Sequence, residues 1–122
     1  EINKICYNIV VEKILIGGYM KQIRESELQQ EVLEHKGIVL VDVFTEWCGY
    51  CHMLVPELEE AQEVLPELKI VKIDAEKTLN FTNDYNIQFY PEMLIFKDGK
   101  LVGTIDGYVK ADVIVEAIKE YM

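Results

Sequence analysis

The chain has 122 residues, of which 50% are hydrophobic and 28% charged, so it is long enough for one folded domain and is not an intrinsically disordered protein. Its formal net charge of −10 at pH 7 argues against a nucleic-acid partner, because the phosphate backbone would be repelled. No apolar run approaches the roughly 20 residues that span a bilayer, so no membrane-spanning segment is expected.

Two regions are predicted: an N-terminal extension, residues 1–18, and a single domain, residues 19–122. The extension is apolar without a clear period. A cytoplasmic location is expected. Because the chain begins with Glu1 rather than Met, the alternative is the periplasm or the exterior after loss of a signal peptide. Three cysteines are an odd number, which argues against a fold held by structural disulfides, and Cys6 is interpreted as a bystander.

The first half of the domain is expected to contain a helix, a strand, a second helix and a second strand. The first helix is predicted to start at Ser26, which has capping-box spacing to Gln29. Residues 38–44 and 69–74, with the sequences IVLVDVF and KIVKID, are typical of strands buried on both faces. The helix between them contains Pro56, which is expected to kink it. This strand–helix–strand unit predicts a right-handed crossover and a parallel pair.

The second half is expected to contain a short helix, a hairpin and a closing helix. The short helix covers residues 76–86 and turns Leu79 and Tyr85 inward. Residues 93–97 and 100–106 are antiparallel strands joined by Asp-Gly, a strong hairpin signal. The closing helix is amphipathic, with an inward face of Val113, Ile114, Ala117, Ile118 and Tyr121. The predicted fold class is α/β, a central mixed β-sheet flanked by helices on both faces.

Two cysteines three positions apart, Cys48 and Cys51, lie where the second helix begins. Such a pair can close a small disulfide ring, and the unpaired N–H groups of a helix N-terminus favour a thiolate at the first position. Cys48 is therefore predicted to attack a disulfide and Cys51 to resolve the mixed disulfide. The alternative is half of a zinc site, which needs two more ligands; the other cysteine and histidines of the chain are Cys6, His35 and His52.

Asp42 is a lone carboxylate inside the apolar strand 38–44. Burial there disfavours its charge and raises its pKa, so Asp42 is predicted to lie beneath the cysteines and to take the proton of Cys51 through a water. The alternative is an Asp that faces solvent at a strand edge. Lys72, in the neighbouring strand, is predicted to place a positive charge near Asp42. The alternative is a lysine that faces solvent.

The dipeptide Tyr90-Pro91 comes just before the third buried strand. An X–Pro bond at this place can be cis. A cis bond would turn the backbone of Tyr90 outward, and its N–H and C=O would then pair with an extended substrate peptide. The dipeptide on its own favours the alternative, an ordinary turn proline.

The chain resembles the thioredoxin family over about residues 19–122, in the order and spacing of Asp42, Trp47, Cys48, Gly49, Cys51, Pro56, Lys72, Pro91, Gly99 and Gly107. The resemblance implies a thioredoxin fold whose redox centre is Asp42, Lys72 and the two cysteines, with a cis proline facing the disulfide. It also implies that Trp47 shields the pair and contacts substrate. The expected substrate-binding surface further includes Gly49, Tyr50, Tyr90, Pro91 and Gly107. No metal and no cofactor is expected other than the redox-active Cys48–Cys51 disulfide.

Three functions follow from these residues. The first is a monomeric thiol–disulfide oxidoreductase that reduces protein disulfides and is regenerated by a reductase such as thioredoxin reductase. The second is a disulfide oxidase or isomerase in an extracytoplasmic compartment, since Tyr50 stands where thioredoxins have Pro and this position helps to set reducing strength. The third is a redox-inactive binding module on the same fold, against which the intact Trp-Cys-Gly-x-Cys motif argues.

Overall fold

Five strands form one mixed sheet in the order β1-β3-β2-β4-β5. The computed structural model describes residues 20–122; the predicted extension and Cys6 lie outside the described residues. The strands are β1 (Lys21–Ile23), β2 (Ile38–Phe44), β3 (Lys69–Asp74), β4 (Glu92–Lys97) and β5 (Lys100–Asp106). The bounds predicted for β2, β3 and β5 are confirmed, because each is a run of strand-forming residues that ends at a turn signal.

The strand–helix–strand crossover is also confirmed. Strand β3 pairs in parallel with β1 and β2, whereas β4 is antiparallel to β2 and β5 is antiparallel to β4. The crossover helix α2 (Gly49–Val64) includes Pro56 within its length. Because β2 lies in the middle of the sheet and is buried on both faces, its apolar sequence has no polar side.

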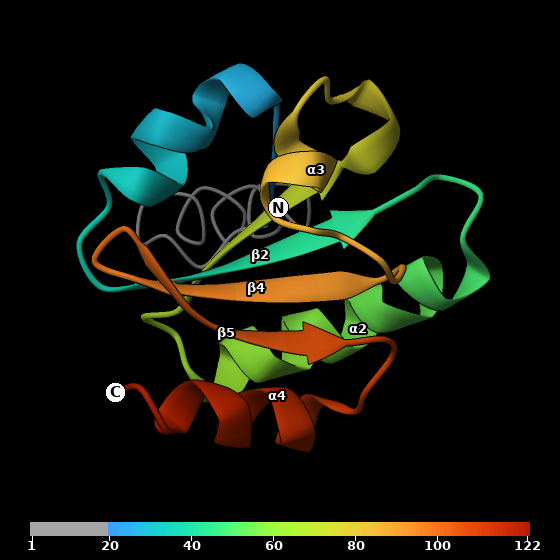
Figure 1. Cartoon of the computed structure of the whole chain (residues 1–122). Helices are drawn as coiled ribbons and strands as arrows, with labels where there is room; N and C mark the ends of the chain where they lie inside the picture. Colours follow the sequence, from blue (N-terminus) through green and yellow to red (C-terminus); the bar gives the residue numbers. More distant parts are fainter. Residues whose placement is uncertain (1–19) are drawn as a thin grey trace, which may run out of the picture.

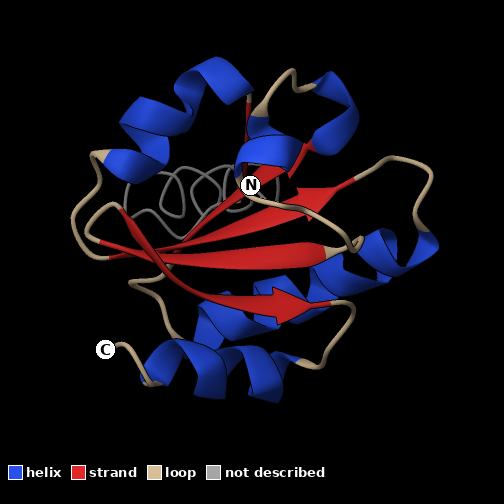
Figure 2. Ribbon diagram, viewed as in Figure 1, coloured by secondary structure: helices blue, strands red, loops and turns tan. Residues whose placement is uncertain are grey.

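Helices cover both faces of the sheet (Figure 1, Figure 2). Helices α2 and α4 (Ala111–Lys119) pack on one face, where Leu40 of β2 lies in a core with Leu54 and Ile114. The other face is covered by short helices: η1 (Glu25–Glu27), η2 (Gln29–Leu33) and α3 (Phe81–Asp84). A further short turn, η3 (Ala75–Lys77), follows β3. Alternate residues of β2 thus supply two separate cores, as the period of a strand requires.

The hairpin turn between β4 and β5 is the Asp98-Gly99 pair that the sequence predicts. Both residues have positive φ, 51° and 82°, as the turn that matches strand twist requires. Asp98 also ties this turn to the start of β2: its Oδ1 accepts from the N–H of Gly37 at 2.8 Å and its own N–H donates to the Gly37 carbonyl at 3.0 Å. A Cβ on Gly99 would collide with the carbonyl oxygen of Leu33.

The helix predicted from Ser26 is wrong in its start and type. A 3₁₀ turn, η1, precedes a π-helical turn, η2. The carboxylate of Glu27, rather than the amide of Gln29, accepts from a free N–H at the start, that of Arg24 at 2.9 Å. The cap therefore lies at Arg24, two residues before the predicted start.

Two predicted inward residues are wrong. Leu79 is 89% exposed, because residues 76–86 form no single helix and the carboxylate of Glu25 accepts from the backbone N–H of Leu79 and of Phe81 instead. Val113 is 48% exposed and Val115 is buried in its place. Within residues 20–122, no helix is long and apolar enough to cross a bilayer.

Candidate active site

The two cysteines are joined by a backbone hydrogen bond at the start of α2. The chain leaves β2 at Phe44, turns, and enters the helix at Cys48, whose backbone is still extended. The Cys48 Sγ accepts from the N–H of Cys51 at 3.2 Å, so this sulfur caps the helix at the end that favours an anion. Both cysteines are buried, Cys51 more deeply, with 3% exposure against 7% for Cys48.

Cys51 lies in surroundings that keep its proton in place. Burial first of all, then the hydrogen bond with Cys48 and the charges of Cys48 and Asp42, raise the pKa of the Cys51 thiol to about 12, although a backbone hydrogen bond with Thr45 lowers it. The Cys51 thiol therefore stays protonated at neutral pH until a base takes its proton.

Asp42 is fully buried in β2. Neither of its carboxylate oxygens has a hydrogen-bond partner among the described residues. Burial raises its pKa to about 7, and the charge of Lys72 opposes this rise. The predicted burial and raised pKa are both confirmed, and near neutral pH this carboxyl gains or loses a proton readily.

Lys72 pairs in register with Asp42 across β2 and β3. Its Nζ lies 4.8 Å from the centroid of the Phe44 ring, a distance at which the ring face attracts an ammonium group. Phe44 in turn packs with both cysteines. Lys72 thus holds a positive charge beside the carboxyl without bonding to it.

The Tyr90–Pro91 peptide bond is cis, as the sequence predicts. It lies against the first cysteine, since the thiol of Cys48 donates to the Tyr90 carbonyl at 3.5 Å. The sequence interpretation expected this carbonyl to be free, but in the structure it contacts the Cys48 sulfur. The N–H of Gly107 donates to the Pro91 carbonyl at 2.8 Å, which brings the end of β5 to the same place.

The site thus combines a thiol pair at a helix N-terminus, a buried carboxyl with a pKa of about 7 and a cis proline. Comparison with known proteins points to the same kind of site. A family model described as Thioredoxin matches residues 19–120. The chain belongs to the thioredoxin family.

Relatives within and beyond the thioredoxins are similar to this chain. A thioredoxin of Listeria monocytogenes is 39% identical over 104 residues, which cover 84% of this chain and 99% of that one. Thioredoxin 1 of Synechococcus elongatus is 33% identical, over 82% of this chain and 94% of that protein. Protein disulfide-isomerase A3 of Gallus gallus is 37% identical over 81% of this chain, which is 20% of its own length.

A solved structure that is similar to this chain shares the fold. It comes from a study of the thiol resolving mechanism in yeast mitochondrial 1-Cys peroxiredoxin via glutathione/thioredoxin systems, with a TM-score of 0.74 and 22% identity. The alignment covers 83% of this chain and 94% of that chain. This family membership, together with the paired thiols, makes the protein a thiol–disulfide oxidoreductase.

Aromatic side chains flank the cysteines of this thioredoxin-family site. Trp47 is 70% exposed, and its ring meets the edge of Tyr90 with centroids 6.5 Å apart. Tyr50 is 62% exposed and lies 6.3 Å from Tyr108. Gly49, between the cysteines, faces open space. All the residues predicted for the substrate surface therefore lie on or next to the two segments that meet at Cys48.

Three residues near the thioredoxin-family site were missed by the sequence interpretation. Glu92, the first residue of β4, is buried, and a charged residue beside Pro91 was the signal that could have found it. Thr45, whose hydroxyl is buried without a hydrogen-bond partner among residues 20–122, and Tyr108 gave no signal.

The zinc alternative has no cluster to support it within residues 20–122, where no group of three His, Cys, Asp or Glu side chains is placed to hold a metal ion. His52 points its Nε2 at the carbonyl oxygen of Glu46, 2.6 Å away. Cys6 lies outside the described residues.

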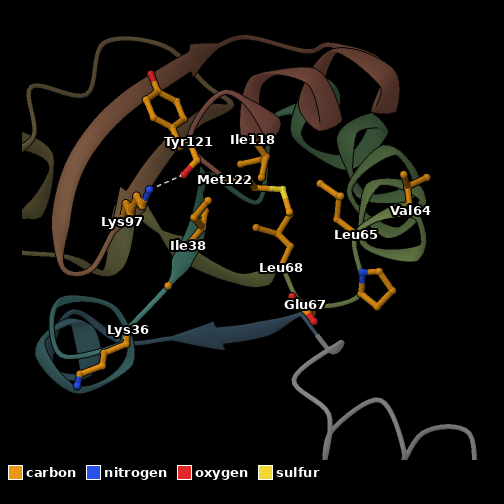
Figure 3. Close-up of a pocket in the computed structure, with 12 residues that line it drawn as sticks. Lys36, Ile38, Val64, Leu65, Glu67, Leu68, Lys97, Ile118, Tyr121 and Met122 are labelled. Carbon is orange, nitrogen blue, oxygen red and sulfur yellow. Dashed lines mark hydrogen bonds between the residues drawn. The ribbon is translucent and has the colours of Figure 1, made fainter.

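A separate pocket lies at the other end of the sheet (Figure 3). It is bounded by the start of β2, the turn after α2 and the residues after α4, with a volume of about 610 Å³. At its rim, Lys97 Nζ donates to the Tyr121 carbonyl at 2.7 Å. None of the site residues lines this pocket.

Proposed function

We propose that this protein reduces disulfides in other proteins. The thiolate of Cys48 attacks one sulfur of the substrate disulfide, whose bond breaks, and the second substrate sulfur leaves as a thiolate that takes up a proton. The thiolate of Cys51 then attacks the Cys48 sulfur of the mixed disulfide, which releases the other substrate thiolate. Two electrons pass to the substrate, and Cys48 and Cys51 end as a disulfide.

Asp42 acts in the second step as the base for Cys51. Support for this role comes from its burial next to the thiol, its pKa of about 7 and the raised pKa of the Cys51 thiol. A base whose pKa lies near the working pH combines availability with strength. Lys72 limits the rise in the pKa of Asp42 and so keeps the carboxyl in this range.

The substrate lies along Tyr90 and Pro91, with Trp47 and Tyr50 against its side chains. Support for this surface is the contact between the Tyr90 carbonyl and the Cys48 thiol. A main-chain group at the sulfur can hydrogen-bond the backbone of any extended peptide. Exposed aromatic rings add apolar contact area without requiring a particular sequence.

One observation carries the proposal: the buried carboxyl of Asp42 has no hydrogen-bond partner among residues 20–122, and its charge acts on the Cys51 thiol, which must lose its proton during reduction. A redox-inactive binding module would gain nothing from this arrangement, since an unpartnered buried carboxyl lowers stability. We also propose that the chain acts as a monomer in a reducing compartment, such as the cytoplasm, where a reductase such as thioredoxin reductase returns electrons to the disulfide.

Insulin reduction with dithiothreitol as the electron source tests the proposal, with Cys48→Ser as the inactive control. The parent is expected to accelerate insulin precipitation and the variant is not. The reduction potential of the cysteine pair then separates reductase from isomerase: a value near about −270 mV fits a thioredoxin-like reductant, whereas about −180 mV fits an isomerase. An inactive parent would leave only the binding-module function.

A further inference from the structure

Glu92 is a second buried carboxyl at the active-site end of the sheet, and the proposed reaction makes no use of it. It follows Pro91 directly and opens β4, with 6% of its surface exposed. Its strand neighbours are Val43 on β2 and Asp106 on β5. Because Met93 faces the core under α2 and Leu94 the opposite core, Glu92 lies on the face away from Asp42.

The carboxylate of Glu92 holds the loop that leads to the cis proline. Its Oε1 accepts from the N–H of Gln88 at 3.3 Å. The N–H of Phe89 also stabilises its ionised form. A side chain at the start of a strand thus reaches back four residues and closes the loop between α3 and β4.

The same loop carries the carbonyl that touches the reactive sulfur. Along the chain, Tyr90 follows the backbone that Glu92 binds and precedes Pro91. The Pro91 carbonyl accepts from the N–H of Gly107 at 2.8 Å. Its own carbonyl accepts from the Cys48 thiol. The position of the Tyr90 backbone is therefore fixed from two sides, by Glu92 before it and by Gly107 after it.

The loop supplies the backbone donors that favour the ionised carboxyl of Glu92. Burial, and to a smaller extent the charge of Asp106 on the neighbouring strand, raise its pKa, while the backbone N–H groups of Gln88 and Phe89 lower it. Among the described residues, these two N–H groups are what favours the ionised carboxyl. Moving the loop away would leave a buried carboxylate without donors, which is costly.

We propose that Glu92 is a positioning residue for protein-disulfide binding, which fixes the Tyr90 carbonyl at the Cys48 sulfur by holding the Gln88–Phe89 backbone. The inference rests on the proposed reductase function, to which it adds a residue that acts through the substrate-binding backbone. Loss of the contact loosens the binding surface but leaves the cysteines and Asp42 in place, so the defect falls on substrate binding.

Insulin reduction by the parent and by Glu92→Ala, Glu92→Gln and Asp106→Asn tests this role. For Glu92→Ala, KM is expected to rise about tenfold while kcat falls less than about threefold. Glu92→Gln keeps a carbonyl oxygen for the N–H of Gln88 and is expected to restore KM to within about threefold of the parent. Asp106→Asn, which removes the neighbouring exposed carboxylate, is the matched control and should leave KM unchanged. An unchanged KM in Glu92→Ala overturns the proposal.

Amide hydrogen exchange at Gln88 gives a readout that does not depend on catalysis. Glu92→Ala is expected to speed exchange at this amide about tenfold, with no change in α2. If the parent reduces no insulin, the reductase proposal fails, while exchange at Gln88 still decides whether Glu92 holds the loop. Glu92→Thr, too short to reach Gln88, replaces Glu92→Ala if the latter does not fold; if neither folds, Glu92 is structural and the positioning role is overturned.

Discussion

Asp42 and Lys72 lie side by side in register on β2 and β3, yet among the described residues no ion pair or hydrogen bond joins them. The ammonium group of Lys72 lies over the ring of Phe44 instead. The carboxyl thus feels the charge of Lys72 without being bonded to it. Desolvation therefore outweighs attraction, and the pKa of Asp42 rises to about 7.

Replacing Asp42 by Asn is expected to stabilise the reduced protein at alkaline pH. The folded-state pKa of about 7 lies above the ordinary 3.8, so the folded parent binds the proton more tightly than the unfolded chain does. The free energy of unfolding of the parent therefore falls by up to about 4 kcal/mol as pH rises from 3.8 to about 7, and it stays low at higher pH. Urea unfolding should show Asp42→Asn more stable than the parent at pH 8 and similar to it at pH 4. Equal stability of the two proteins at pH 8 contradicts the prediction.

The same substitution is expected to slow the release of the mixed disulfide. Loss of a general base costs on the order of 100-fold in rate, but hydroxide replaces it in part as pH rises. Stopped-flow measurement of single turnovers should show the parent rate levelling off above about pH 7, where the carboxyl is ionised, while the rate of Asp42→Asn continues to rise. The defect is thus largest at and below neutral pH. Identical pH profiles would show that Asp42 is only a tolerated buried carboxyl.

Alkylation of the reduced protein by iodoacetamide is expected to label Cys48 before Cys51. The reagent reacts with thiolates, and the pKa of about 12 keeps Cys51 protonated. Fragmentation mass spectrometry can locate the label on either residue. In Cys48→Ser, labelling of Cys51 should stay slow, since its burial remains. Faster labelling of Cys51 than of Cys48 reverses the two roles.

Cys51→Ser is expected to trap a mixed disulfide between Cys48 and a protein substrate. Without the resolving thiol, the intermediate has no fast intramolecular exit. Non-reducing electrophoresis after mixing with insulin should show a covalent adduct that dithiothreitol removes. The Cys48→Ser variant should form no such adduct through Cys51. Full multiple-turnover activity of Cys51→Ser is the outcome that rules out the dithiol mechanism.

Gly99→Ala is expected to destabilise the fold far more than Gly37→Ala does. Both glycines have positive φ, 82° and 95°, so each alanine pays the conformational penalty of about 1 kcal/mol or more. A Cβ at Gly99 also collides with the Leu33 carbonyl, whereas nothing lies within 4 Å of one at Gly37. Urea unfolding should show a loss of about 3 kcal/mol or more for Gly99→Ala. Similar losses of stability in both variants would mean that the positive φ alone accounts for the destabilisation and that the Leu33 carbonyl adds nothing.

Local sequence was enough to predict the central sheet and the cysteine pair. Residues 38–44 and 69–74 form strands as predicted, because each carries its own apolar run and bounding turns. The burial of Asp42 was also predicted correctly, and the cis bond at Pro91 was predicted correctly from the family resemblance. These features depend on neighbours in the chain or on a strand that is apolar on both sides.

Contacts between distant segments explain other features that the sequence did not predict. Leu79 was expected inside, but Glu25, which is 54 positions away, binds its backbone N–H and holds the segment as a surface turn. The burial of Glu92 follows from its register between β2 and β5, and the only local sign of it was a charged residue beside Pro91. The position of Tyr108 beside Tyr50 likewise results from the return of the chain after β5.

The paired hydrogen bonds between Gly37 and Asp98 have a practical consequence for protein engineering. They lie at the end of the sheet that is remote from Cys48, where Ile38 pairs with Lys97. That end is anchored by this pair of bonds, while the buried side chains of residues 20–122 that lack a hydrogen-bond partner, Asp42 and Thr45, lie at the reactive end. A search for heat-tolerant variants, or for an attachment point on a support, should therefore begin at the anchored end, where changes leave the thiols and their surroundings untouched.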